Sequence, residues 1–193
     1  MKITAIDDAN DLWLVEDIFD PELLKNIPLD LPWEDIDPRQ EPGRRQIGAW
    51  AVDKDHPFSQ MQKHTQSMER YWSQFFGELT MVQKSRVWWD GCKFMMKEHV
   101  DGSLSPSAGK NGHYNPQAAM QIYLTEGQGQ AGTTFYNPDM SVRHTFPYKI
   151  NTGYVMRNHG GQLHGVLEGN SNQRRLSLYV GFQFEIKDLA LVD

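Results

Sequence analysis

Residues 174–184 read RRLSLYVGFQF, and this stretch decides the fold class. Successive side chains of a β-strand point to opposite faces of the sheet. One face of such a strand is apolar and holds Leu176, Leu178, Val180 and Phe182. The opposite face carries a cation and polar groups: Arg175, Ser177, Tyr179 and Gly181. We expect the apolar face to pack on helices and the opposite face to line the interior of a β roll.

Short β-rich runs broken by Gly, Asn, Asp and Pro fill the chain after Gly77. They cover residues 81–89, 93–100, 117–124, 133–136, 143–148, 153–157, 162–167 and 174–185. Short strands separated by turn residues are typical of a sandwich or jelly roll rather than of βαβ units. The sequence therefore predicts a mainly β protein, with a jelly roll (double-stranded β-helix) over residues 81–187.

The first 80 residues are expected to give helical support to this core. Residues 12–26 have the pattern of a short strand followed by a helix, because Asp20 can cap and Pro21 can take the first helical position. Residues 27–46 are rich in Pro, Asp and Arg, and are expected to form an irregular connection.

A second helix is expected to begin at Pro57. Apolar residues recur there at steps of three and four, from Phe58 to Phe75, which is the spacing of one helical face. Asp55 is the expected start signal and Gly77 the expected stop. We expect this helix to cover one face of the sheet.

The chain of 193 residues fits one domain, which can bury enough surface to fold without a structural metal. Its single cysteine, Cys92, excludes an internal disulfide. The first residues turn acidic before an apolar signal segment could form, and no transmembrane run follows. We therefore expect a cytoplasmic protein with no membrane partner.

The net charge of -6 is unevenly distributed. Residues 1–42 hold twelve Asp and Glu against three Lys and Arg, whereas the remainder holds thirteen against sixteen. The cations of the remainder are scattered along strand-like segments rather than gathered on one face, which disfavours nucleic acid as a partner. A small anionic cosubstrate would need only one or two of them.

A candidate metal site begins with His99 and Asp101. Two residues apart on a strand, their side chains point to the same side and can bind one ion. A third ligand must come from elsewhere in the roll, and the candidates are His113, His144, His159 and His164. His164 is preferred because it lies in the strand-like run QLHGVLE, eleven residues before Arg175. His159 is the reserve choice, and His56 and His64 are expected on a helix surface or in a loop.

Two histidines and one carboxylate on one face of an octahedral ion leave three positions open. Those positions can accept a bidentate cosubstrate and dioxygen, whereas a closed structural zinc site leaves none. The residue types therefore favour a non-haem Fe(II) centre.

At this point the sequence resembles the 2-oxoglutarate/Fe(II)-dependent dioxygenase superfamily and, within it, the prolyl-4-hydroxylase-like group. The resemblance covers about residues 81–185. Its elements are, in order, WDG at 89–91, HVD at 99–101, IYL at 122–124, GTTF at 132–135, HGV at 164–166 and RRLSL at 174–178. It implies that His99, Asp101 and His164 are the catalytic iron ligands. It also implies Fe(II), 2-oxoglutarate and dioxygen as cofactor and cosubstrates, with ascorbate as a possible addition.

The resemblance further implies that Arg175 binds the 5-carboxylate of 2-oxoglutarate, because a guanidinium fork matches a carboxylate bidentately. Arg174 competes for this role, but Ser177 shares the face of Arg175 and completes the family's Arg-x-Ser pair. Tyr123 matches the family's tyrosine that reaches the same carboxylate, or is an ordinary strand aromatic. Trp89 stands where the family more often has Tyr, which weakens a strict prolyl hydroxylase assignment.

The implied activity is hydroxylation of an aliphatic C–H bond in a peptidyl side chain or small molecule, with release of succinate and CO2. Asp101 favours hydroxylation, because halogenating relatives lack this carboxylate. The loops at 102–116 and 38–48 are expected to face the substrate. Two alternatives stay open: a cupin-like metal-binding β roll with another dioxygenase or isomerase activity, and a non-catalytic binding module.

Overall fold

The computed structural model describes residues 1–7, 11–36, 43–68, 71–73, 79–82, 85–92, 94–100, 118–127, 130–157, 162–167 and 174–184. The N-terminal elements are β1 (Lys2–Asp7), β2 (Leu12–Glu16), α1 (Pro21–Leu24), β3 (Glu34–Asp35), β4 (Arg44–Gly48) and α2 (Pro57–Ser67). The following strands are β5 (Leu79–Val82), β6 (Arg86–Asp90), β7 (Met96–His99), β8 (Ala118–Tyr123), β9 (Ala131–Tyr136), β10 (Val142–Pro147), β11 (Thr152–Arg157), β12 (His164–Val166) and β13 (Arg175–Phe184). The chain is therefore mostly β, as the sequence predicts.

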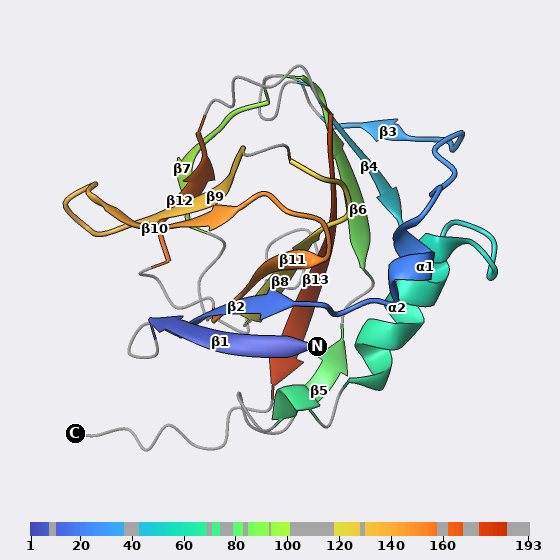
Figure 1. Ribbon diagram of the computed structural model, residues 1–193, viewed down its shortest axis with the longest axis horizontal. Coiled ribbons are helices and arrows are strands. Elements are labelled where there is room, and N and C mark those ends of the chain that lie inside the picture. The colour runs from blue at the N-terminus through green and yellow to red at the C-terminus, as the bar shows by residue number, and fades with distance from the viewer. Residues whose placement is uncertain are drawn as a thin grey trace, which may run out of the picture.

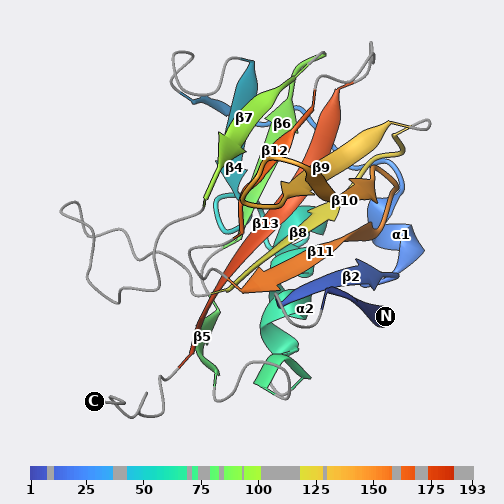
Figure 2. The ribbon, with the colours of Figure 1, turned by 90° about the vertical axis from the view of Figure 1, so that its left-hand side faces the viewer.

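The strands form two antiparallel sheets that face each other (Figures 1 and 2). The major sheet has nine strands in the order β1-β2-β11-β8-β13-β6-β4-β3, with β5 paired to β13. The minor sheet has four strands in the order β10-β9-β12-β7. Several neighbouring strands, such as β2 and β11 or β8 and β13, are far apart in sequence, as in a jelly roll. The predicted jelly roll is confirmed, and its inner faces enclose the candidate site.

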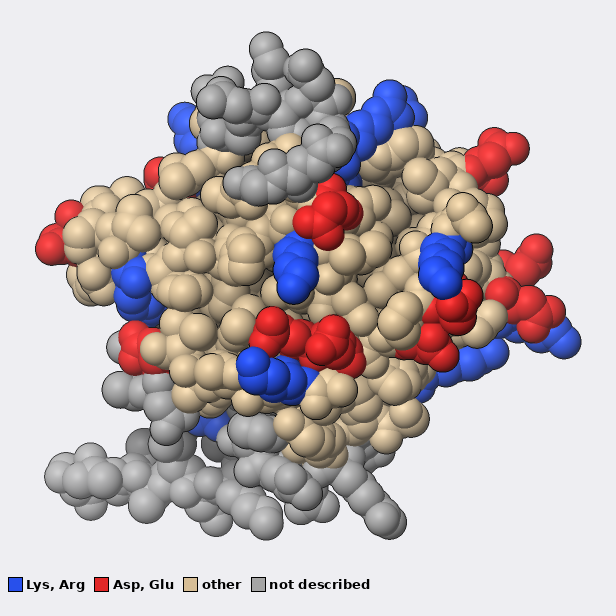
Figure 3. Space-filling view, viewed as in Figure 1, with Lys and Arg blue, Asp and Glu red and all other residues tan. Residues whose placement is uncertain are grey.

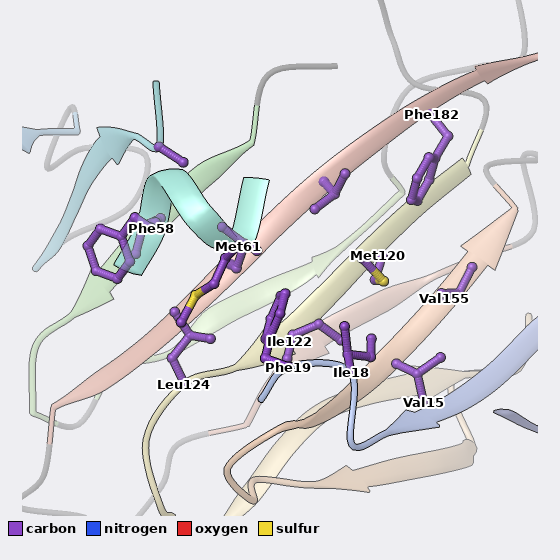
Figure 4. Packing of buried hydrophobic residues seen from close by; sticks show 14 of the residues in the cluster. Val15, Ile18, Phe19, Phe58, Met61, Met120, Ile122, Leu124, Val155 and Phe182 are labelled. Carbon is purple, nitrogen blue, oxygen red and sulfur yellow. The ribbon is translucent and has the colours of Figure 1, made fainter. Parts of the chain in front are cut away.

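Helix α2 covers the outer face of the major sheet (Figure 1). Met61 on α2 lies next to Leu124, just beyond the end of β8, and Phe58 and Ile122 belong to the same buried cluster (Figure 4). These four side chains are between 0% and 1% exposed. Burying such side chains contributes roughly 1.5–3 kcal/mol each, so this layer holds the sheet in place. The expected packing of the helix on the sheet is confirmed.

Strand β13 lies between β8 and β6 in the middle of the major sheet. Its apolar face joins the core under α2, where Leu176, Leu178, Val180 and Phe182 are at most 2% exposed. The face with Arg175, Ser177 and Tyr179 looks toward the minor sheet, because Tyr179 packs against the second core, which contains Phe135 of β9 and Phe146 of β10. The predicted alternation is therefore confirmed.

The expected helical N-terminal support is not confirmed in the form predicted. Strands β1 to β4 extend the major sheet, and α1 is a single turn, although Asp20 caps it through Oδ1 and Pro21 begins it as expected. Residues 44–46, expected in an irregular connection, belong to β4. Such strands are placed in the sheet by pairing with other segments of the chain. Their own residues therefore predict a strand only weakly.

Helix α2 begins and ends differently from the prediction. Its N-cap is His56, whose Nδ1 accepts a hydrogen bond from the Phe58 backbone at 3.2 Å, rather than Asp55. It ends at Ser67, with Met68 as its C-cap, instead of continuing to Phe75. Gly77, the expected stop, lies outside the described residues.

Charged side chains of both signs are interspersed on the face shown in Figure 3. This distribution differs from the concentrated cationic face of a duplex-binding protein. Among the described residues, no helix is both long and apolar enough to cross a membrane.

Candidate active site

Two histidines meet across the minor sheet. His99, the last residue of β7, is the Cα partner of His164, the first residue of β12. Their imidazole centroids are 4.5 Å apart, and their planes meet at 49°. Antiparallel partners point to the same face, so a register set by β7 and β12 places two imidazoles within reach of one ion.

Backbone carbonyls orient both rings in the same way. The Nδ1 atom of His99 lies 2.9 Å from the Lys97 carbonyl oxygen, and the Nδ1 atom of His164 lies 2.8 Å from the Gln162 carbonyl oxygen. A carbonyl oxygen only accepts, so each Nδ1 carries the proton and each Nε2 carries the lone pair. Metal-binding histidines are commonly fixed by such a bond from the other ring nitrogen. The pair therefore presents two Nε2 donors of the kind that Fe(II) accepts.

The expected carboxylate ligand, Asp101, lies outside the described residues, as do His113 and His159. Within the described part of the chain, no group of three His, Cys, Asp or Glu side chains is assembled. His144 is on β10, two strands from β12, and its ring contacts Phe146 rather than His99 or His164. The structure therefore brings together His99 and His164, and leaves His144 apart from them.

Close packing of β12 against β7 explains the glycine of the HGV element. A Cβ atom added to Gly165 would lie 2.8 Å from the Met96 carbonyl oxygen on β7. Only a residue without a side chain lets β12 approach β7 so closely. Gly165 thus allows the pairing that brings His164 to His99.

Arg175 opens the inner row of β13 and is 6% exposed. Its guanidinium carbon lies 4.7 Å from the centroid of the Tyr148 ring and 5.7 Å from that of Tyr123. Its Nε atom is buried and has no hydrogen-bond partner, and no described carboxylate forms an ion pair with it. A buried cation without a counter-charge is costly. A buried guanidinium of this kind is suited to binding an anion.

The Tyr123 hydroxyl makes two hydrogen bonds to Thr133 on β9. It donates to Thr133 Oγ1 at 3.0 Å and accepts from the Thr133 backbone N–H at 2.7 Å. Burial raises the pKa of the Tyr123 hydroxyl, although the Arg175 charge and these two hydrogen bonds act in the opposite direction. The phenol therefore stays neutral at physiological pH. Its ring flanks Arg175, while its hydroxyl ties β8 to the minor sheet.

Close packing explains why the first residue of the GTTF element is glycine. A Cβ atom added to Gly132 would lie 2.4 Å from the Tyr123 hydroxyl and 2.8 Å from the Phe146 carbonyl oxygen. The hydroxyl therefore occupies the space that any other residue at position 132 would fill.

Ser177 is 3% exposed and ends a chain of oriented side chains. The Tyr154 hydroxyl donates to Gln121 Oε1 at 2.7 Å, and Gln121 Nε2 donates to Ser177 Oγ at 2.9 Å. Because Gln121 must donate here, Ser177 accepts, and its own hydrogen is directed elsewhere. That O–H group, on the same face as Arg175, is suited to an anion.

Arg174 and Trp89 lie on the opposite face of the sheet. The guanidinium carbon of Arg174 is 4.7 Å from the centroid of the Trp89 ring, and Arg174 is exposed. Trp89 in turn packs against Trp33, at 5.0 Å between centroids. The neighbouring Trp88 enters the roll from β6 and stacks on Tyr179. Trp89 is thus directed away from the interior that the family's tyrosine would occupy.

The sequence did not reveal the roles of three residues around the cation. Tyr148 flanks Arg175 and places its hydroxyl 3.0 Å from the Leu176 backbone nitrogen, which donates to it. Arg44 and Asp90 form a buried ion pair beside it. Asp90 was visible in the WDG element, but its partner lies 46 residues away in sequence, where no local pattern points to it.

No family model and no curated protein sequence matches the chain. Solved structures do match. A prolyl-4-hydroxylase from Pseudomonas putida superposes with a TM-score of 0.68 at 15% identity, over 93% of this chain and 96% of that one. A prolyl hydroxylase from Trichoplax adhaerens, in complex with a hypoxia inducible factor oxygen degradation domain peptide fragment, gives a TM-score of 0.67 at 11% identity, over 96% and 89% of the two chains.

A third match is HygX from Streptomyces hygroscopicus, solved with nickel, 2-oxoglutarate and hygromycin B, with a TM-score of 0.61 and 11% identity over 93% and 85% of the two chains. The protein thus has the fold of the 2-oxoglutarate/Fe(II)-dependent oxygenases. Among those solved structures, prolyl-4-hydroxylases share this fold over nearly the full length of both chains.

Proposed function

We propose that the protein is a 2-oxoglutarate- and Fe(II)-dependent dioxygenase. In this reaction a substrate C–H bond, dioxygen and 2-oxoglutarate give a C–OH bond, succinate and CO2. The observation that carries the proposal is that a pair of Nε2-presenting histidines on the minor sheet and a buried arginine on the facing major sheet, with which no described carboxylate forms an ion pair, share the interior of the roll. These are the two halves of the proposed site: the histidines would bind a metal, and the arginine would bind one carboxylate of a dicarboxylate.

The two halves are connected by direct contacts. Arg175 flanks Tyr123, whose hydroxyl is bonded to Thr133 on β9. Two residues further along β9, the Phe135 ring stacks on His164. This path runs across the inner space between the two sheets, so an extended diacid held by Arg175 would point its other end toward the histidines.

Each residue then has a defined task. His99, His164 and Asp101 would hold Fe(II), which when bound supplies the positions at which 2-oxoglutarate and dioxygen react. Arg175 would bind the distal carboxylate bidentately, and the Ser177 hydroxyl would donate to the same group. The rings of Tyr123 and Tyr148 exclude water from the cation, which strengthens its attraction for an anion.

The substrate would be a peptidyl side chain or a small molecule with an aliphatic C–H bond. The structural neighbours include one solved with a peptide fragment and one solved with hygromycin B, and both kinds of substrate are compatible with the fold. Hydroxylation is the proposed outcome, because Asp101 supplies the carboxylate that halogenating relatives lack.

The test is succinate formation from 2-oxoglutarate by the purified protein with Fe(II), dioxygen and ascorbate, across a panel of peptides and small molecules. Coupled turnover is expected to give product with a mass increase of one oxygen. His99→Ala or Asp101→Ala should abolish coupled turnover, whereas His144→Ala, the matched control on β10, should retain it. An iron-replete, active His99→Ala variant would refute the ligand assignment.

The cosubstrate assignment has its own matched pair. Arg175→Met should abolish 2-oxoglutarate binding, measured by calorimetry with Mn(II) in place of Fe(II), whereas Arg174→Met should leave it unchanged. Absence of both succinate formation and 2-oxoglutarate binding in iron-loaded wild-type protein would instead favour a cupin-like activity or a binding module.

A further inference from the structure

Asp90 lies between two arginines in one row across the major sheet. Its Cα partner on β4 is Arg44, and its Cα partner on β13 is Arg175. Cross-strand partners point to the same face, so all three side chains share the inner face of the sheet. Their exposures are 3% for Arg44, 2% for Asp90 and 6% for Arg175. A single buried carboxylate thus has two buried cations as neighbours.

Asp90 pairs with only one of them. Arg44 Nε lies 2.6 Å from Asp90 Oδ1, and Arg44 Nη2 lies 3.1 Å from Asp90 Oδ2, so both carboxylate oxygens are occupied. Arg175 forms no ion pair with any described carboxylate, and its buried Nε has no hydrogen-bond partner. If Asp90 pairs with Arg44, Arg175 is available to an incoming anion; if Asp90 pairs with Arg175, it is not.

Aromatic contacts hold Arg44 in the position that captures Asp90. Its guanidinium carbon lies 4.4 Å from the centroid of the Trp88 ring and 4.4 Å from that of Phe94. Its Nη1 atom lies 3.7 Å from the Met96 sulfur on β7. Planar stacking of this kind, together with bidentate pairing, is specific to arginine. These contacts fix the Arg44 guanidinium so that its Nε and Nη2 atoms face the two carboxylate oxygens of Asp90.

We propose that Arg44 is a positioning residue that sequesters Asp90 and thereby keeps Arg175 available for the distal carboxylate of 2-oxoglutarate. This inference rests on the proposed function. Without the Arg44 charge, Asp90 would be a buried carboxylate that lacks a counter-ion one strand away from a buried cation. Two such groups pair with each other, because leaving both charges uncompensated costs more. The internal carboxylate would then compete with the cosubstrate for Arg175.

The experiment is a double-mutant cycle on 2-oxoglutarate affinity, measured by calorimetry with Mn(II), which does not depend on turnover. Arg44→Met is expected to weaken 2-oxoglutarate binding by about tenfold or more. Asp90→Asn is expected to bind at least as tightly as wild type, because the competing charge is gone. The double variant R44M/D90N should bind like Asp90→Asn, so that loss of Arg44 matters only while Asp90 carries its charge.

The matched control is Arg45→Met. Arg45 is the next residue on the same strand, and its side chain points to the other face, where it forms an exposed ion pair with Asp35 at 2.8 Å. This variant should bind 2-oxoglutarate like wild type. If R44M fails to fold, as judged by circular dichroism, Arg44→Gln replaces it in the cycle, because its amide is polar enough for the buried position but carries no charge to pair with Asp90.

The outcomes separate the two proposals. Wild-type protein that does not bind 2-oxoglutarate overturns the proposed function itself. Wild-type binding with unchanged affinity in folded R44M, or with no recovery in R44M/D90N, overturns the role of Arg44 alone. Weaker binding in Asp90→Asn would also overturn it, because Asp90 would then support Arg175 rather than compete for it.

Discussion

The ring of Phe135 lies almost parallel to the imidazole of His164, at 20° and with 5.2 Å between centroids. Phe135 is itself fully buried, and Phe146 and Tyr154 meet it edge-on at 5.6 Å and 5.1 Å. Because the Gln162 carbonyl oxygen fixes one edge of the imidazole and Phe135 covers one face, His164 has little rotational freedom. We infer that Phe135 preorganises His164, the proposed metal ligand.

Phe135→Leu should therefore weaken metal binding as well as stability. Leucine fills only part of the space and leaves the imidazole face uncovered, so the ring can turn away from the position shared with His99. We expect a loss of metal affinity of about tenfold, within the range for partners that orient a ligand. Equilibrium dialysis with Fe(II) or Mn(II) measures this loss, and thermal unfolding of the metal-free protein measures the accompanying destabilisation.

Phe146→Leu is the matched control for that prediction. Phe146 is fully buried in the same cluster and contacts Phe135, but among its ring contacts His164 does not appear. Its replacement should reduce stability to a similar degree and leave metal affinity close to wild type. Equal losses of metal affinity in both variants would show that Phe135 acts only through general packing.

The sequence predicted those parts of the site that local pattern determines. Strict alternation in β13 places Arg175 and Ser177 inside, since a one-residue shift would turn Leu176 and Leu178 out of the core. The helical spacing around Phe58 correctly identified the buried face of α2. It did not show that the helix ends at Ser67, because Trp72 continues the same buried face after the break and is 1% exposed.

Contacts that depend on sheet registry could not be predicted. Arg44 meets Asp90 because β4 pairs with β6, and β4 was hidden in a segment with the composition of a loop. Strand β1 has a burial pattern without clean alternation, as expected for an edge strand whose place is decided by pairing with β2. Tyr148 flanks Arg175 only after β10 and β13 have been brought together in space.

Tyr123→Phe should separate the structural role of this tyrosine from its expected role in the site. The substitution removes the acceptor of the Thr133 backbone N–H, which is buried and would lose its partner. The expected cost is about 1–3 kcal/mol of unfolding free energy, measured by chemical denaturation. The phenyl ring still flanks Arg175, so the affinity for 2-oxoglutarate should fall less than in Arg175→Met. A fall as large as in Arg175→Met would assign the hydroxyl itself to cosubstrate binding.

The stability of the metal-free protein should depend on His144 in mildly acidic solution. Burial and the neighbouring Arg143 charge lower the pKa of the His144 imidazole below its ordinary value of 6.5. The unfolded state therefore binds a proton at a higher pH than the folded state, and stability falls as pH drops below about 6.5. His144→Gln should lose less stability than wild type between pH 7.5 and pH 5.5 in urea denaturation. Parallel pH profiles for the two proteins would contradict this prediction.

Asn151 should be sensitive to substitution for two separable reasons. Its side chain clamps Phe19, accepting from the backbone N–H at 3.0 Å and donating to the carbonyl oxygen at 2.8 Å, and its φ is 59°. Asn151→Gly loses both hydrogen bonds but tolerates the left-handed backbone, whereas Asn151→Ala loses the bonds and adds backbone strain. We expect both variants to be destabilised. The free energy of unfolding of Asn151→Ala should be about 1 kcal/mol lower than that of Asn151→Gly. Urea denaturation measures the difference, and a glycine variant as stable as wild type would show that the clamp on Phe19 contributes nothing.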